Sequence, residues 1–110
     1  MQVKHSDIAM AEVSPAWDYE RLADVFTALG NPLRLRILEL VSKSDRPLHI
    51  KAIANLTKTR YSLAYKHVKT LEEADLVTIY EVGRSRVVAL KSPELLQKAF
   101  TLGSQILGER

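Results

Sequence analysis

The sequence predicts a single, mainly helical domain that carries one small β-hairpin. The chain has 110 residues, of which 46% are hydrophobic and 26% charged, which is enough for one core and too little for a second domain. Between residues 76 and 91, β-branched residues predominate on both sides of a glycine-containing turn, as is typical of a hairpin. Three pairs of a capping residue and a proline each mark the beginning of a helix: Ser14 and Pro15, Asn31 and Pro32, and Ser92 and Pro93.

The first half of the chain predicts two helices behind a short arm. Residues 1–13 show no periodicity and are expected to form a flexible arm, so the folded domain should span residues 14–110. The first helix is expected to end at Gly30, in a left-handed conformation. The second helix begins at Asn31 and is apolar on most sides, so it should be the buried centre. The apolar residues of the first helix keep three- and four-residue spacing: Tyr19, Leu22, Val25, Phe26 and Leu29.

Two further helices are predicted after a polar turn at residues 42–47. The third helix should span residues 48–56, with four residues facing inward: Ile50, Ile53, Ala54 and Leu56. After a turn at residues 57–59, a longer helix should run from Arg60 to Ala74, with an apolar stripe of Leu63, Ala64, Val68 and Leu71. Its opposite face is polar and aromatic, and consists of Arg60, Tyr61, Ser62, Tyr65, Lys66 and Lys69.

The last third of the chain predicts the hairpin and a final helix. Strands at residues 76–82 and 86–91 flank a turn made of Gly83, Arg84 and Ser85. The final helix begins at Ser92 and has a broader apolar face than one side of a small core requires, so we expect a dimer contact there. This face has two parallel rows: Leu95, Ala99, Leu102 and Ile106, and Leu96, Phe100, Gly103 and Leu107.

Positive charge is concentrated in one segment of the chain. The formal net charge is only +3, but residues 51–71 contain no acid and five basic residues: Lys51, Lys58, Arg60, Lys66 and Lys69. This acid-free segment is the best candidate for contact with a polyanion. The alternative is a solvated helix face that is basic by chance. Arg34 and Arg36 lie outside the segment, and we expect them to be solvated partners of Glu39 or Asp24.

The predicted elements follow the order of a winged helix-turn-helix domain with five helices. In such a domain the second of two short helices enters the major groove of double-stranded DNA, and the hairpin, or wing, reaches a neighbouring phosphate or the minor groove. Alternatively, Tyr61 and Tyr65 pack on the surface, and Thr59 and Ser62 only cap a helix. The residues expected to contact DNA are Lys58, Arg60, Tyr61, Ser62, Tyr65, Lys66, Lys69, Arg84, Ser85 and Arg86.

Two segments of the chain resemble the ArsR/SmtB-type winged-helix repressors. They read ALGNPLRLRILELV at residues 28–41 and YSLAYKHVKTLEEADLV at residues 61–77, and the similarity extends over residues 20–92. The resemblance implies a homodimeric, sequence-specific transcriptional repressor whose first and last helices form the dimer interface. On those helices the expected interface residues are Trp17, Leu22, Phe26, Leu95, Ala99, Phe100, Leu102 and Ile106.

The metal sites of that family are missing from this sequence. Metal-sensing members carry cysteines at the start of the third helix, where this chain has Leu48, His49, Ile50 and Lys51. Other members use a set of histidines and acids on the last helix, which has no histidine here. The resemblance is therefore to archaeal-type members without metal-sensing cysteines, and no metal or other cofactor is expected. Lys58 stands where the family usually has a turn glycine.

The composition argues against several other functions. Without cysteine the chain has neither a disulfide nor a thiolate metal site. His5, His49 and His67 are too scattered to bind a metal or to serve a nucleophile, so we do not expect an enzyme. The sequence has no apolar run that could cross a membrane and no signal-peptide pattern, so a cytoplasmic location is expected.

The rival function is a winged helix that docks on protein in a transcription or replication assembly. Neither the operator nor a small-molecule effector follows from the sequence.

Overall fold

The computed structural model describes residues 16–109. Within them the chain forms α2 (Tyr19–Leu29), α3 (Pro32–Lys43), β1 (Leu48–His49), α4 (Ile50–Thr57), α5 (Tyr61–Glu73), β2 (Val77–Val82), β3 (Ser85–Leu90) and α6 (Pro93–Ile106). This confirms the prediction of five helices with a hairpin wing. The expected arm at residues 1–13, the expected helix start at Ser14 and Pro15, and His5 lie outside the described residues.

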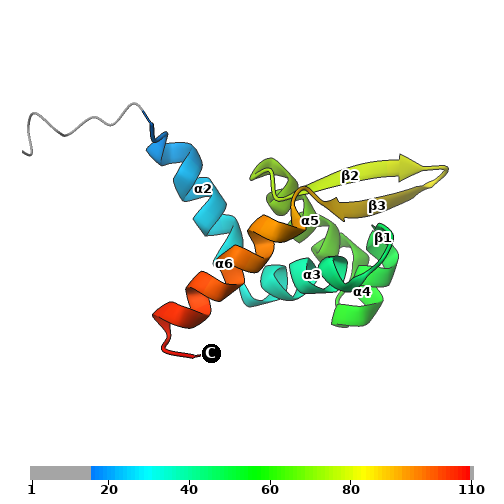
Figure 1. The fold of residues 1–110 in the computed structure, drawn as a ribbon. Helices are drawn as coiled ribbons and strands as arrows, with labels where there is room; N and C mark the ends of the chain where they lie inside the picture. Colours follow the sequence, from blue (N-terminus) through cyan, green and yellow to red (C-terminus); the bar gives the residue numbers. More distant parts are fainter. Residues whose placement is uncertain (1–15, 110) are drawn as a thin grey trace, which may run out of the picture.

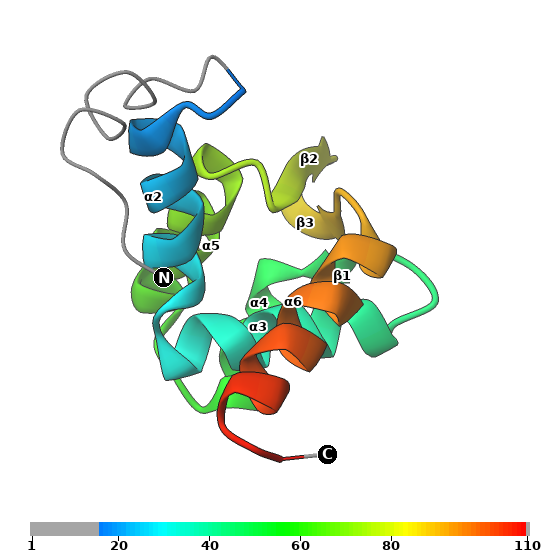
Figure 2. The same ribbon diagram turned by 60° about the vertical axis from the view of Figure 1, so that its left-hand side comes forward.

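The wing and the two terminal helices extend from opposite sides of a central body (Figure 1). The body consists of α3, α4 and α5 with the base of the small sheet. The β2–β3 hairpin projects from one side of it, and α2 and the carboxyl end of α6 project from the other. The turned view shows α2 alongside α5, and α6 lying across α3 (Figure 2). The molecule therefore has two separate ends, the wing and the pair of terminal helices.

The sheet is antiparallel and has the strand order β1-β3-β2. β2 pairs with β3 along its whole length and forms the hairpin. The short strand β1 adds two pairs on the other edge of β3: Leu48 opposite Val88, and His49 opposite Val87. The body is consequently joined to the middle of β3 through β1, and α4 begins directly after β1.

The hydrophobic core is built by α3, α4, α5 and the sheet. The largest fully buried side chains are Ile37, Leu38, Ile50, Ile53, Leu71, Val68, Val77 and Val88. By contrast, α2 and α6 each bury a single residue, Ala28 and Leu96. Burying one large aliphatic side chain stabilises a fold by about 1.5–3 kcal/mol. Most of the stabilisation therefore comes from the body, and the terminal helices keep most of their apolar surface exposed.

Two capping residues set the beginnings of α3 and α6, as predicted. The side chain of Asn31 accepts a hydrogen bond from the backbone N–H of Arg34 at 3.0 Å. The hydroxyl of Ser92 accepts one from the backbone N–H of Leu95 at 3.2 Å. Each cap is followed by a proline in the first turn, where a missing N–H costs nothing.

The first helix differs from the prediction at both ends. It begins at Tyr19, capped by the carboxylate of Asp18, and the residues just before the cap are not helical. Gly30 is not left-handed, because its φ is −83° and the chain passes directly into the extended Asn31 that caps α3. A Cβ at Gly30 would lie 3.2 Å from the carbonyl oxygen of Phe26. Glycine thus suits this corner because the backbone approaches closely, and not because φ is positive.

Arg34 joins three helices at the α2–α3 corner. Its Nε donates to the carbonyl oxygen of Ala28 at 2.7 Å and its Nη2 to that of Thr27 at 3.1 Å, at the carboxyl end of α2. Its Nη1 lies 3.1 Å from Nδ1 of His67 on α5. Burial, together with the charge of Arg34, lowers the pKa of His67 below its ordinary value of 6.5, which favours the neutral ring that accepts this N–H. The expectation that Arg34 pairs with a solvated acid is therefore wrong.

The beginning of the third helix was predicted two residues too early. Leu48 and His49 pair with β3 as strand β1, so α4 begins at Ile50. At the other end of α4, Leu56 was expected to face inward but is 53% exposed, and Thr57 takes the buried position. A local pattern cannot reveal a strand partner that lies nearly forty residues further along the chain, which is why β1 was missed.

Two smaller differences concern α5 and the hairpin. Leu63 was assigned to the apolar stripe of α5, but its side chain is exposed, whereas the other three stripe residues are buried. Ser85 pairs with Val82, so the turn contains two residues, Gly83 and Arg84, and not three. Gly83 has a φ of 62°, which agrees with the preference for glycine in two-residue hairpin turns.

We expect Arg34→Ala to lower the free energy of unfolding by about 2 kcal/mol, because it leaves two carbonyl oxygens of α2 without their charged donor. Urea denaturation at one fixed protein concentration measures the change. Arg36→Ala, on the exposed side of α3, is the matched control and should stay within about 0.5 kcal/mol of the wild type. Equal stabilities for the two variants would contradict the structural role of Arg34.

Candidate nucleic-acid interface

The turn between α4 and α5 sets the direction of α5. Lys58 ends α4 in the left-handed conformation, with φ 57° and ψ 43°, a geometry that usually favours glycine. The hydroxyl groups of Thr57 and Thr59 lie 2.8 Å apart, and Thr57 also donates to the carbonyl oxygen of Ile53 at 2.8 Å. Thr59 therefore ties the turn to α4. The N-cap residue of α5 is Arg60, which makes no side-chain capping bond.

The amino-terminal half of α5 carries a pair of stacked aromatic rings. The ring centroids of Tyr61 and Tyr65 are 6.4 Å apart, and the ring planes differ by 5°. Residues four apart lie one above the other on a helix, so the two rings share one edge of α5. Tyr65 is half-buried and packs against the core, while Tyr61 is exposed. Tyr65 thus supports the ring that reaches solvent.

The wing packs on this aromatic pair through Arg86. The guanidinium carbon of Arg86 lies 4.8 Å from the centroid of the Tyr65 ring, where a cation is attracted by the negative ring face. Alternate residues of a strand share a face, so Arg86 lies on the same face of β3 as the buried Val88. Tyr61, Tyr65 and Arg86 form one continuous stack, the aromatic–arginine stack, from α5 to the wing.

Other residues of the predicted DNA-contacting set lie around this stack. Ser62 and Lys66 are exposed on α5, and Arg60 is exposed at its amino-terminal end. Lys58 is exposed in the preceding turn. At the wing, Arg84 is exposed in the hairpin turn and Ser85 is half-buried beside it. Arg60, Ser62 and Lys66 line one region of the surface together with Tyr61 and Tyr65, while Lys58 lies in the preceding turn and Arg84 at the tip of the wing.

Lys69, one of the predicted DNA contacts, has its positive charge paired with an acid on the same helix. Its Nζ lies 2.8 Å from Oε1 of Glu72 on the same helix. The hydrogen bond to Glu72 and the charge of that carboxylate raise the pKa of Lys69. Lys69 is accordingly charged but already paired, and it contributes less free positive charge than Lys66 does.

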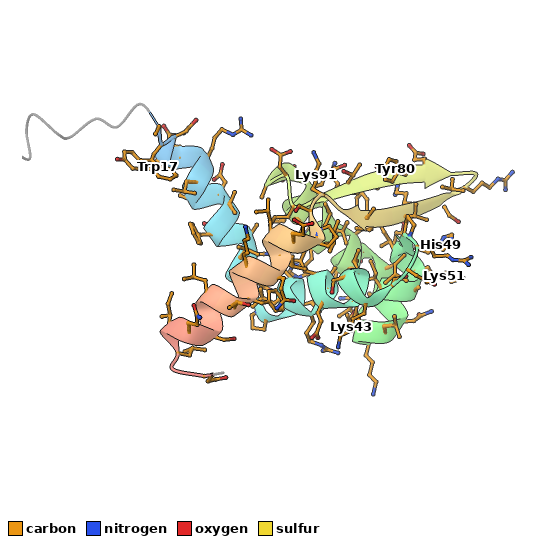
Figure 3. The ribbon with its side chains drawn as sticks, in the orientation of Figure 1. Trp17, Lys43, His49, Lys51, Tyr80 and Lys91 are labelled. Carbon is orange, nitrogen blue, oxygen red and sulfur yellow. The ribbon has the colours of Figure 1, made fainter. Side chains whose placement is uncertain are left out.

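β1 and the first turn of α4 bring two further residues beside the wing. His49 pairs with Val87 of β3, and Lys51 lies in the first turn of α4. Both side chains are exposed, and Figure 3 shows them together below the hairpin. His49 and Lys51 were not among the predicted DNA contacts, although Lys51 belongs to the acid-free segment. The position of Lys51 in the acid-free segment was the sequence signal that could have added it to the predicted contacts.

Two other kinds of site are absent from residues 16–109. No three acidic or histidine side chains in this part of the chain are grouped so that they could hold a metal ion. No helix in the same part combines the length and the apolar character that a membrane span requires.

A separate apolar surface lies on the side of the body away from the wing. An open groove of about 670 Å³ runs between α2, α6 and the start of α3. Of the predicted dimer residues, this apolar groove gathers Phe26, Leu95, Ala99, Phe100, Leu102 and Ile106. Trp17 and Leu22 line a different hollow near the beginning of α2, where Figure 3 shows Trp17. The side chains of Ile106 and Leu95 are 76% and 63% exposed, so one chain leaves this surface open.

Comparison with known proteins identifies a domain family and a relative that resemble the helix-turn-helix part of this chain. A helix-turn-helix domain family matches residues 29–80. A relative from Methanocaldococcus jannaschii, described as an uncharacterized HTH-type transcriptional regulator, is 32% identical over 65 residues. That match covers 59% of this chain and 72% of the relative.

Solved structures share the fold of the whole described chain. A homodimeric winged helix-turn-helix DNA-binding domain from Mycobacterium bovis, a possible ArsR-family regulator, has a TM-score of 0.72 and 22% identity. The match covers 96% of this chain and 94% of that one. An ArsR-like transcriptional regulator from Rhodococcus has a TM-score of 0.62 and 27% identity, with 82% of this chain and 81% of that one covered.

The aromatic–arginine stack should couple the wing energetically to α5. We expect the combined loss of stability in a Tyr65→Leu, Arg86→Ala double variant to be smaller than the sum of the two single losses, because either change alone already breaks the contact. Urea denaturation of the four proteins measures this. Arg84→Ala with Tyr65→Leu is the control pair and should be additive, since Arg84 lies in the turn. Additive losses for both pairs would contradict the coupling.

Proposed function

We propose that this chain, which belongs to the ArsR-like winged helix-turn-helix transcriptional regulators, is a homodimeric repressor that reads operator DNA with α5 and holds the DNA backbone with its wing. The observation that carries the proposal is the aromatic–arginine stack. It joins the exposed side of α5 to the wing and lies within a region that is rich in basic residues and, over residues 51–71, free of acids.

The dimensions of α5 suit the major groove of DNA. Its 13 residues correspond to a length of about 20 Å, and the groove is wide enough to admit one helix. In helix-turn-helix proteins the amino-terminal residues of the recognition helix contact base edges. Tyr61, Ser62 and Lys66 occupy that part of α5, so we assign base reading to them. Tyr65 supports them from its half-buried position.

The wing and the turn supply positive charge for the phosphate backbone. Arg84 lies exposed at the tip of the hairpin, Lys58 in the turn and Arg60 at the amino-terminal end of α5. Contacts to phosphate position a protein on DNA but carry no sequence information. We therefore assign these three residues to affinity and not to specificity. The paired Lys69 takes a minor part.

A second copy of the chain is the proposed occupant of the apolar groove. A homodimer would cover Phe26, Leu102 and Ile106, which one chain leaves more than half exposed, and such contiguous apolar surfaces commonly mark interaction sites. The homodimeric Mycobacterium bovis neighbour supports this arrangement. A two-fold dimer presents two α5 helices to two half-sites of one operator. A dimer bound across a promoter would repress by occupying it.

A protein-docking module is the competing function. The matched relatives are described as transcriptional regulators and not as enzymes or assembly factors, which favours DNA as the partner. The two functions differ in their response to salt, because DNA binding releases counterions and protein docking through this surface would not require a duplex.

Variants of the wing and of α5 should separate phosphate contacts from base contacts. The test uses a duplex selected from a random pool with the wild-type protein, and a second duplex with the same bases in scrambled order. Arg84→Ala should weaken binding to both duplexes equally, and should flatten the log–log dependence of affinity on salt by about 0.9. Lys66→Ala should weaken the selected duplex chiefly, by about 5- to 150-fold. Fluorescence anisotropy with both duplexes at two salt concentrations measures these effects.

The outcome also tests the choice of partner. Lys43→Ala on α3, where the lysine faces solvent away from the wing (Figure 3), is the matched control and should leave both affinities unchanged. If neither duplex binds at low salt, DNA is not the partner and the docking module is favoured. If Arg84→Ala affects the selected duplex alone, the assigned roles are reversed.

The apolar groove should hold a dimer that a single charge disrupts. Leu102→Glu should shift the protein from twice the mass of one chain to the monomer in sedimentation at micromolar concentration, because the carboxylate would be buried without a partner. Gln97→Glu adds the same charge to the exposed side of α6, outside the groove, and should remain dimeric. A monomeric wild type would refute the proposed dimer.

A further inference from the structure

Leu63 occupies an unexpected position for a large aliphatic residue. It lies in the first turn of α5 and its side chain is 42% exposed, although the next stripe residue, Ala64, is fully buried. Tyr61, two residues earlier, is 43% exposed. Both side chains therefore present apolar surface to solvent at the end of α5 that we assign to base reading. Packing of the core does not explain why the side chains of Leu63 and Tyr61 are exposed.

These two residues are walls of one hollow on the surface of α5. The hollow has a volume of about 550 Å³, has mainly apolar walls, and is lined by Arg60, Tyr61, Ser62, Leu63, Tyr65 and Lys66. The stacking of Tyr61 on Tyr65 fixes the position of one wall. The hollow is thus an open depression with mainly apolar walls, and two basic residues, Arg60 and Lys66, are part of its lining.

The chemistry of the lining indicates which base it suits. Adenine is read by asparagine or glutamine and cytosine by acids, and the lining contains none of these residue types. Arg60 and Lys66 are of the types that read guanine, but such a contact uses their charged ends and not the apolar walls of the hollow. Thymine is the base that presents an apolar group, the C5 methyl, in the major groove, and apolar side chains contact it. Arg60, which we assign to the phosphate backbone, matches the charge of the phosphates, and a protein partner with an apolar side chain would not supply that charge.

We propose that the hollow formed by Tyr61 and Leu63 receives thymine methyl groups, so that the operator half-site carries thymine opposite the first turn of α5. This inference rests on the proposed function, since it requires α5 to lie in the major groove. It identifies Leu63 as a specificity-determining residue that contributes through its apolar surface and not through a hydrogen bond.

The test replaces thymine by uracil, which keeps every hydrogen-bonding group and removes only the methyl. A duplex is first selected from a random pool with the wild-type protein, and each thymine of its half-sites is then replaced in turn. We expect uracil at one position per half-site to weaken binding about fourfold, the effect of losing one buried methyl group. Uracil outside the bound region should have no effect.

Variants of the chain identify the residue that contacts the methyl. Leu63→Ala should bind thymine and uracil duplexes with nearly equal affinity, whereas Leu63→Met, which keeps the apolar bulk, should retain the fourfold difference. Leu56→Ala is the matched control, because Leu56 is also an exposed leucine but does not line the hollow. It should retain the difference as well.

The results separate this inference from the function on which it rests. If no duplex is enriched and none binds at low salt, the proposed function fails. If a duplex is enriched but uracil substitution leaves the affinity of the wild type unchanged, DNA binding stands and the thymine contact is wrong. The same conclusion follows if Leu63→Ala keeps the full difference between thymine and uracil.

Discussion

The hydrogen bonds of Arg34 hold α2 at its corner with α3 and link it to α5. One guanidinium binds the last carbonyl oxygens of α2 and contacts His67 on α5, while the backbone of the same residue is held by the Asn31 cap. The helix that borders the apolar groove is therefore fixed to the helix that carries the aromatic–arginine stack. Because α2 buries only Ala28, these hydrogen bonds help to hold α2 in place, as apolar packing does for the helices of the body.

The distribution of burial explains why a small chain can present two interaction surfaces. The body alone contains the fully buried aliphatic side chains, so the terminal helices and the wing are free to expose residues that would otherwise be needed in the core. Polar bonds and ring stacking then hold those parts in position. In the wing this is the contact of Arg86 with Tyr65, and at the corner it is Arg34.

Local signals in the sequence predicted most of the fold. Asn31 and Ser92, each followed by proline, marked two helix beginnings correctly, because a cap acts within three residues of itself. Several of the misassigned residues depend on distant partners. Leu48 and His49 are strand residues only because β3 lies beside them, and Arg34 finds its acceptors on two other helices. For the candidate site, residue types indicated the basic surface, but the stacking of Tyr61, Tyr65 and Arg86 required the folded chain.

The shortness of β1 determines how much of the wing is paired with the rest of the chain. Its two residues pair with β3 only at Val87 and Val88, in the middle of that strand, so the sheet has three strands there and two on either side, toward the tip and toward the body. A two-stranded ribbon has little stability of its own. The hairpin residues beyond Val87, from Glu81 to Arg86, pair only with one another, so the tip is held by these pairs and by the contact of Arg86 with Tyr65. Loss of that contact would leave the tip held by backbone pairing alone, without altering the pairs that join β1 to β3.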